Sequence, residues 1–423
     1  MQRIRFVREL IKDYATIPAL FLSSASTQYE IVSASEVRPG DLIGVTYFSG
    51  NSWPAATKAR RLFPKHKIIV GGIGVLAHYE RLLRSGVADY VYLGEGFDFD
   101  ERHVVTVKDL GRTVPTAQDV DFDKLPLVRV SKNSYYFLIE KGCPYRCEYC
   151  YVSWANKFKS MKADKLKQKC VAIERKLSGK HITLVSNDGI AKHKNRDFFA
   201  KLSRNRFENQ SLPLKMYLQN PAAFEKQLIV RVGVELPTEE SRQRILPRMK
   251  QITDAELSEF LGSAKGNRES TLFYIYNYVG LTRQDYLRIV DIARQKSPAS
   301  RLRLSFTSLE VQPYTALVPR LLEHIENILR GENFQNSELN RRLVNISGVK
   351  VFPPKMMASV LHTHLFTYLP HRYKLPSPRT GETAREFLAR TKAANPGVNV
   401  LYEIERRAKA MQLDKGYNLK LVP

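Results

Sequence analysis

The sequence predicts an α/β protein, and three observations support this class. Short apolar runs alternate with amphipathic segments in two long stretches of the chain, a pattern typical of βαβ units and parallel sheets. The chain has 423 residues, which suggests two to three domains. Hydrophobic residues make up 43% of it and charged residues 26%, which excludes a wholly disordered chain.

The first alternating stretch predicts a Rossmann-like domain over residues 1–125. We expect strands at 41–48, 67–70 and 89–93, with helices at 54–62 and 78–85. Gly71 and Gly72 follow the second strand, and Gly94 follows the third. Glycine at the carboxyl end of such a strand lets a ligand approach the backbone, although a tight turn explains the same residues. The polar segment 98–133 is expected to be a linker.

The second stretch predicts a partial (β/α)6 barrel over residues 126–330. Expected strands are 135–139, 181–185, 214–218, 228–234, 271–276 and 302–306, with a helix at 285–295 among the segments between them. Six such units are fewer than the eight of a closed barrel. Residues 331–423 form a basic, mainly helical tail, in which Thr383 and Glu386 have the spacing of a capping box. A second tail helix is expected at 401–411.

The charge balance predicts a polyanionic partner. The chain has 67 Lys and Arg against 42 Asp and Glu, a net charge of +25, which favours RNA or DNA. An anionic membrane, a phosphorylated substrate or a merely soluble surface would also suit this charge. No stretch of 18 uncharged apolar residues occurs and the first residues lack the apolar run of a signal peptide, so we expect a cytoplasmic protein without a membrane partner.

Three of the four cysteines form the most informative motif. Cys143, Cys147 and Cys150 have the spacing C-x3-C-x2-C directly after an expected strand. Three thiolates on one short loop can hold three irons of a [4Fe–4S] cluster and leave the fourth iron open. Zinc is the alternative, with Cys170 as fourth ligand. Cys170, however, falls on the apolar stripe of an expected helix, which favours a buried structural thiol.

The cysteine loop resembles the signature of the radical S-adenosylmethionine (SAM) superfamily, including the aromatic Tyr149 before the third cysteine. The resemblance implies that the open iron chelates the amino and carboxylate groups of SAM. An electron from the cluster then cleaves SAM into methionine and a 5′-deoxyadenosyl radical, which abstracts hydrogen from the substrate. The electron would come from a donor such as flavodoxin or ferredoxin.

The same resemblance implies further SAM-binding residues. Asn187 and Asp188 follow the second expected barrel strand, where the family places groups that bind the SAM amino group. Gly233-Val-Glu235, followed by Arg244-Ile-Leu246 and Met249-Lys250, resembles the fourth-strand segment, so Glu235 is a candidate for the SAM ribose or amino group. Gln219 ends the third expected strand and is either directed into the barrel mouth or a plain structural amide.

Two segments depart from the family pattern. Only Gly280 is retained of the glycine-rich fifth-strand segment, which leaves the adenine contacts there in doubt. Tyr314 replaces a glycine in the sixth-strand segment.

The first domain resembles the cobalamin-binding domains that are fused to some radical SAM cores. The residues that carry this resemblance are those around Gly71, Gly72, Gly94 and Glu95. No Asp-x-His-x-x-Gly motif supplies a histidine to cobalt, so cobalamin would bind without one. The alternative is a scaffold of the same fold without the cofactor.

His362 and His364 are two residues apart and would share one face of a strand, where they could bind a metal. The alternative is a pair of buried, hydrogen-bonded histidines.

Three functions remain open from the sequence. The first is a radical SAM enzyme that methylates or otherwise modifies a C–H position of a nucleic acid. The second is a cobalamin-dependent methylase of a small metabolite or peptide. The third is a nucleic-acid-binding protein whose cluster is structural.

Overall fold

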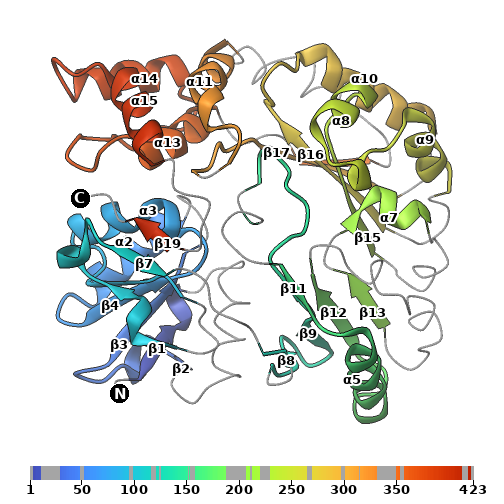
Figure 1. Ribbon diagram of the computed structural model, residues 1–423, viewed down its shortest axis with the longest axis horizontal. Coiled ribbons are helices and arrows are strands. Elements are labelled where there is room, and N and C mark those ends of the chain that lie inside the picture. Colours follow the sequence, from blue (N-terminus) through green and yellow to red (C-terminus); the bar gives the residue numbers. More distant parts are fainter. Residues whose placement is uncertain are drawn as a thin grey trace.

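The computed structural model has the mixed α/β architecture that the sequence predicts (Figure 1). It describes residues 3–10, 29–47, 52–94, 99–115, 121–122, 125–150, 152, 158–186, 206–209, 212–219, 229–263, 269–296, 301–313, 315–330, 349–352, 357–411 and 418–420. None of the helices within these ranges has the length and hydropathy required to cross a bilayer.

The N-terminal sheet has the strand order β2-β1-β3-β4-β5-β6. Its strands are β1 (Ile4–Val7), β2 (Tyr29–Val32), β3 (Leu42–Thr46), β4 (Lys67–Gly71), β5 (Tyr90–Tyr92) and β6 (Val104–Val105). All neighbours pair in parallel except β5 and β6. The helices α2 (Trp53–Leu62) and α3 (Val75–Arg84) connect β3 to β4 and β4 to β5, as expected. The strand order reverses between β1 and β3, and open sheets bind ligands outside the carboxyl ends at such a point.

Two further sheets follow. One has the order β13-β12-β9-β8, and the other is the fully parallel sheet β14-β15-β16-β17-β18. Their strands are β8 (Val128–Arg129), β9 (Ser134–Leu138), β12 (His181–Val185), β13 (Arg206–Asn209), β14 (Leu212–Pro213), β15 (Ile229–Glu235), β16 (Glu269–Tyr276), β17 (Arg301–Ser308) and β18 (Val349–Phe352). Because β13 also contacts β15, the two sheets adjoin.

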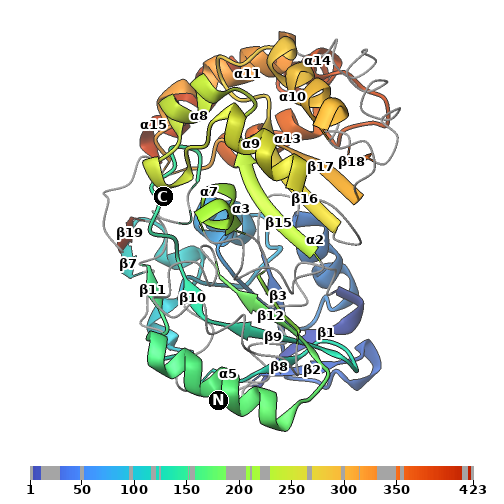
Figure 2. The ribbon, with the colours of Figure 1, turned by 90° about the vertical axis from the view of Figure 1, so that its right-hand side faces the viewer.

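Helices connect or follow these strands. They are α5 (Ala163–Lys176), α7 (Leu214–Gln219), α8 (Glu239–Ile245), α9 (Asp254–Ser263), α10 (Arg283–Lys296) and α11 (Leu321–Arg330). Leu166 and Cys170 of α5 are buried in one apolar cluster with residues of β9 and β12, and Figure 2 shows α5 beside these strands.

The expected strand at 214–218 is wrong, because α7 occupies this segment. Leu214, Met216 and Tyr217 are buried, whereas Lys215 is half-buried and pairs with Glu256 of α9. Short apolar runs fit both helical and strand periods, and here packing against α9 decides for the helix. The extended segments of this unit, β13 and β14, come directly before α7.

The expected linker at 98–133 is also wrong, because its described part contributes to the sheets. Its strand β6 pairs with β5, and β8 pairs with β9. Another of its strands, β7 (Thr113–Pro115), pairs with β19 (Asn418–Lys420) from the C-terminal end of the described chain. Figure 1 shows β19 beside the N-terminal sheet.

The C-terminal region contains α13 (Met357–Tyr368), α14 (Ala384–Ala393) and α15 (Val400–Ala410), grouped with α11 in Figure 1. The expected capping box at the start of α14 is confirmed. Residues of these helices, including Phe387 and Ile404, share one hydrophobic cluster with β15, β16 and β17. The guanidinium of Arg81 on α3 donates to the Leu369 carbonyl at 2.5 Å, so the region also contacts the N-terminal domain.

His362 and His364 lie on α13 and not on a strand, so the expected shared face is wrong. His364 is buried and fully hydrogen-bonded, because its Nε2 accepts from the Val311 amide at 3.0 Å and its Nδ1 bonds the Val360 carbonyl at 2.8 Å. The alternative of buried, hydrogen-bonded histidines therefore describes His364.

Candidate active site at the carboxyl ends of the core strands

The cysteine loop begins beyond the carboxyl end of β9. It leaves the short strand β10 (Glu140–Lys141), which pairs with β11 (Lys159–Ser160), and it turns at Gly142 with a φ of 70°. A positive φ favours glycine because it has no Cβ. Cys147 is buried at 2% exposure, and the Cys150 amide donates to its carbonyl at 3.1 Å. Cys143 and Cys150 are partly exposed.

The loop suits a multi-iron cluster better than a single metal ion. All four cysteines lie in the described part of the chain, and none forms a disulfide. Among the described residues, no group of three His, Cys, Asp or Glu side chains converges as the ligands of one ion must. Each thiolate of a [4Fe–4S] cluster binds a different iron, so the sulfurs need not converge on one point. Cys170 is buried in the apolar cluster under α5, so the zinc alternative gains no support.

Glu235 ends β15 in a left-handed conformation, with a φ of 68°. A β-bulge between Gly233 and Glu235 accompanies this backbone. The carboxylate folds back over the strand, because a Cβ at Gly233 would lie only 2.5 Å from Glu235 Oε1. Gly233 therefore makes the room that the Glu235 side chain occupies, which explains the Gly-Val-Glu sequence physically.

Lys250 is the partner of this carboxylate. Its Nζ lies 3.6 Å from Glu235 Oε1, and its side chain is 14% exposed. It follows the short helix η8 (Arg248–Lys250) and lies 5.4 Å from the centre of the Tyr145 ring, which belongs to the cysteine loop. Burial alone would lower the pKa of Lys250, but Glu235 and the three cysteine thiols raise it well above its usual value. Lys250 therefore stays an ammonium ion beside the loop.

Tyr149 and Tyr278 join the loop to the end of β16. Their rings meet edge-on with centres 6.2 Å apart, and the Tyr278 hydroxyl donates to the Glu148 carboxylate. Burial, and then the neighbouring Glu235 and Cys147, raise the pKa of Tyr149 well above its usual value, so it stays a neutral phenol. Asn277, just before Tyr278, has a φ of 58°; it and Glu235 are the non-glycine residues with positive φ in the described chain.

Two buried hydroxyls at other strand ends have no hydrogen-bond partner. Ser186 directly follows β12, and Ser308 ends β17. Buried polar groups normally find partners, so these two are available to a bound ligand. Both strands are parallel to their neighbours in the sheets, and the Cys loop, Glu235 and Tyr278 also follow carboxyl ends. Polar groups from five strands thus lie at the edges where α/β proteins place their sites.

Several expected site residues lie elsewhere or outside the description. Asn187, Asp188 and Glu95 lie outside the described residues. Gln219 is an exposed residue at the end of α7, so its expected place at a strand end is wrong. Sequence reasoning gave no role to Lys250, Tyr278 or Ser308, because no local pattern shows that they come close to the loop or to a strand end with room for a ligand.

The N-terminal glycines are explained by packing. A Cβ at Gly72, which has a φ of 110°, would lie 2.7 Å from the Tyr47 carbonyl oxygen. A Cβ at Gly94 would lie 2.7 Å from the Tyr92 hydroxyl and 2.9 Å from the His103 ring. At Gly71 a Cβ would make only ordinary contacts. The tight-turn alternative therefore accounts for Gly72 and Gly94 without a ligand.

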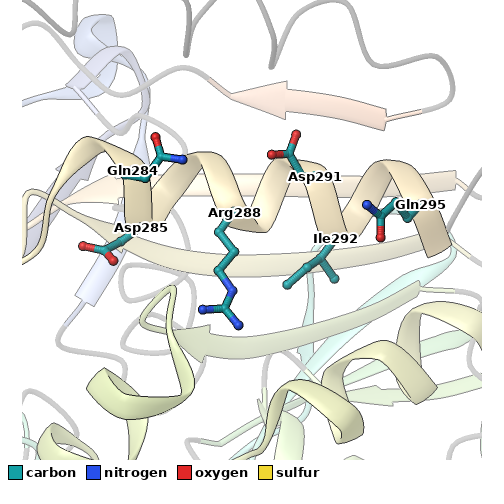
Figure 3. A pocket seen from close by; sticks show the side chains of 6 residues that line it. All are labelled: Gln284, Asp285, Arg288, Asp291, Ile292 and Gln295. Atoms are coloured by element: carbon teal, nitrogen blue, oxygen red, sulfur yellow. The ribbon is translucent and has the colours of Figure 1, made fainter.

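A separate hollow of about 360 Å³ runs along α10 (Figure 3). It is lined by Gln284, Asp285, Arg288, Asp291, Ile292 and Gln295, which are all side chains of this one helix. It contains none of the expected site residues.

No protein-family model and no curated protein matches the sequence. The fold is similar to that of the radical S-adenosylmethionine methyltransferase TsrM from Kitasatospora setae with tryptophan substrate and a SAM analogue bound. The sequence identity is 15%, the match covers 78% of this chain and 76% of that chain, and the TM-score is 0.50. A TsrM structure with cobalamin and a [4Fe–4S] cluster matches at 14% identity over 97% of this chain and 100% of that chain, with a TM-score of 0.49. At such identities the likeness shows the fold, and at that level the expected resemblance is confirmed.

Proposed function

We propose that the protein is a radical SAM enzyme, and that Cys143, Cys147 and Cys150 hold its [4Fe–4S] cluster. The observation that carries the proposal is the C-x3-C-x2-C loop at the carboxyl end of β9, in a chain whose fold is similar to a radical SAM methyltransferase. When bound, the cluster supplies the electron that cleaves SAM.

In this proposal the two adjoining core sheets are two parts of one partial barrel. Strands β9, β12, β13 with β14, β15, β16 and β17 supply its six strands, and β18 adds a strand beyond them. The N-terminal sheet is then a separate Rossmann-like domain. Its parallel strands and its reversal between β1 and β3 support this assignment.

The residues around the loop have defined tasks. The Glu235 carboxylate accepts hydrogen bonds from the amino group or ribose of SAM, as a carboxylate suits an ammonium partner. The unpartnered hydroxyls of Ser186 and Ser308 offer further hydrogen bonds. Asn187 and Asp188, which follow Ser186 in the chain, are proposed to bind the SAM amino group. The aromatic side chains of Tyr145, Tyr149 and Tyr278 exclude water from the site.

We favour methyl transfer to a small metabolite or a peptide, with cobalamin as second cofactor in the N-terminal domain. The TsrM structure of similar fold is a methyltransferase with tryptophan as substrate, which supports a small substrate over a nucleic acid. Gly71, whose Cβ position is open, lies at the carboxyl edge of the N-terminal sheet, where a cofactor would bind.

The net charge of +25 supports one other candidate, a nucleic acid substrate, because polyanions bind basic surfaces. The same surface would attract an acidic electron donor such as flavodoxin or ferredoxin.

Anaerobic reconstitution of the full chain with iron, sulfide and cobalamin tests the proposal. We expect about four irons per chain and SAM cleavage upon reduction. Cys147→Ala should abolish the cluster, whereas Cys170→Ala, the buried thiol outside the loop, should retain it. Product analysis with tryptophan, peptides and RNA then separates the substrate classes. A wild-type chain that binds no iron, or binds it without cleaving SAM, contradicts the proposal.

A further inference from the structure

Lys250 places a buried positive charge beside the cysteine loop. Its ammonium lies 3.6 Å from Glu235 and 5.4 Å from the Tyr145 ring, and Tyr145 stands between Cys143 and Cys147 in the loop. The ammonium interacts electrostatically with all three loop thiols. Lys250 is therefore part of the electrostatic surroundings of every thiol that would bind iron.

The charges around Lys250 do not balance as a simple ion pair. One carboxylate neutralises one ammonium, but the site also contains the three loop thiols, which bind iron only as thiolates. A buried charge requires a partner of opposite sign, and here the negative partners outnumber the positive one. Lys250 consequently stabilises negative charge on the loop as well as on Glu235.

We propose that Lys250 tunes the iron–sulfur cluster: its fixed positive charge makes the cluster easier to reduce, and Glu235 opposes this effect. The inference rests on the proposed function, since it requires the cluster. Reduction adds one electron from an external reductant such as dithionite and breaks no bond. The reduced cluster is more negative by one charge, so a neighbouring cation stabilises it more than the oxidised form.

The test is an EPR-monitored redox titration of the anaerobically reconstituted full chain without SAM. Lys250→Met removes the charge and retains the shape, and we expect the ratio of reduced to oxidised cluster at a fixed potential to fall about tenfold. For a one-electron couple this equals a shift of about 59 mV to lower potential. Glu235→Gln removes the opposing charge and should shift the potential in the other direction.

Two control variants separate charge from structure. Lys250→Arg keeps the positive charge and should retain a potential near that of the wild type. Lys215→Met removes another half-buried lysine that is paired to a glutamate, at 2.7 Å from Glu256 of α9, and should leave the potential unchanged. A merely structural disturbance would not give opposite shifts for Lys250→Met and Glu235→Gln.

The outcomes are distinct. If the wild-type chain binds no cluster, the proposed function fails. If it binds a cluster and neither variant shifts the potential, or both shift it in the same direction, the role of Lys250 is overturned while the proposed function stands. If Lys250→Met fails to load iron, Glu235→Gln alone decides: a raised potential supports the inference, and an unchanged one overturns it.

Discussion

Glu235 shows how one residue depends on a neighbour without a side chain. Its backbone has a φ of 68°, which is costly for a non-glycine residue, and strain of this kind gathers at functional sites. The carboxylate occupies the space above Gly233 and pairs with Lys250. The conformation thus directs a charged group to the strand end instead of along the strand.

Gly233→Ala should weaken SAM binding without loss of the cluster. The added Cβ would come within 2.5 Å of Glu235 Oε1, so the flexible carboxylate must move. We expect a roughly tenfold weaker SAM affinity, equivalent to about 1.4 kcal/mol, in equilibrium binding to reconstituted protein. Gly262→Ala, where a Cβ meets nothing within 4 Å, is the matched control. Unchanged SAM affinity in Gly233→Ala would show that the position of Glu235 is unimportant for binding.

Tyr278→Phe should loosen the cysteine loop. The substitution removes the hydroxyl that donates to Glu148, and a lost hydrogen bond to a charged group costs about 1.5–3 kcal/mol. We expect faster loss of iron to a chelator. Tyr402→Phe, at an exposed position, serves as the control. Equal rates of iron loss in the two variants would contradict a role for Tyr278 in holding the loop.

At the scale of elements, helices of the C-terminal region meet other parts of the chain through buried histidines. His78 on α3 and His362 on α13 both pack against Phe366, with ring centres 5.3 and 5.9 Å away. His324 on α11 faces His364 on α13, with ring centres 5.0 Å apart. Burial lowers the pKa of His78 and His324 to about 3 and that of His362 and His364 to about 4.

These histidines predict an acid-sensitive fold. The folded protein keeps them neutral, whereas the unfolded chain binds protons below a pH of about 6.5. The unfolded state therefore binds more protons between pH 6.5 and about 4, so the free energy of unfolding falls as the pH drops through this window. Each histidine contributes up to about 1.4 kcal/mol per pH unit. Urea unfolding at a series of pH values measures the slope.

His364→Gln should reduce this pH slope, because the amide cannot titrate but can still form hydrogen bonds. His66→Gln, a histidine with no buried ring, should retain the wild-type slope. Equal slopes in the two variants would contradict the assignment of the acid sensitivity to the buried histidines.

At the scale of the whole molecule, the basic tail is part of the core. Phe387, Val400 and Ile404 are each fully buried in the same cluster as strands β15, β16 and β17. The guanidinium of Arg407 on α15 also forms an ion pair with Glu80 on α3. Deletion of this region therefore removes apolar contacts as well as surface charge.

Truncation before residue 371 should consequently destabilise the protein and lower the yield of folded chain. Burial of a large apolar side chain contributes about 1.5–3 kcal/mol, and several such side chains are lost together. Thermal unfolding of the truncated chain against the full chain measures the effect. A truncated chain with an unchanged melting temperature would show that the C-terminal helices fold independently.

The contribution of the tail to polyanion binding is better tested by point charges. Arg372 and Lys409 have exposed side chains, so Arg372→Glu with Lys409→Glu leaves the core intact. If RNA contacts this surface, the salt dependence of RNA binding should become less steep in the double variant. An unchanged slope would place RNA binding elsewhere or remove the tail from it.

The sequence by itself determined the features that depend on neighbouring residues. The alternation of apolar runs identified β3, β4, β9, β12, β15, β16 and β17, and the cysteine spacing identified the loop, because both signals lie within a few consecutive residues. The tertiary structure decided α7, where packing overrode an ambiguous apolar run, and the helical position of His362 and His364. It alone brought Lys250 and Tyr278 to the cysteine loop, more than 90 residues away, because strand pairing between distant segments sets which carboxyl ends lie together.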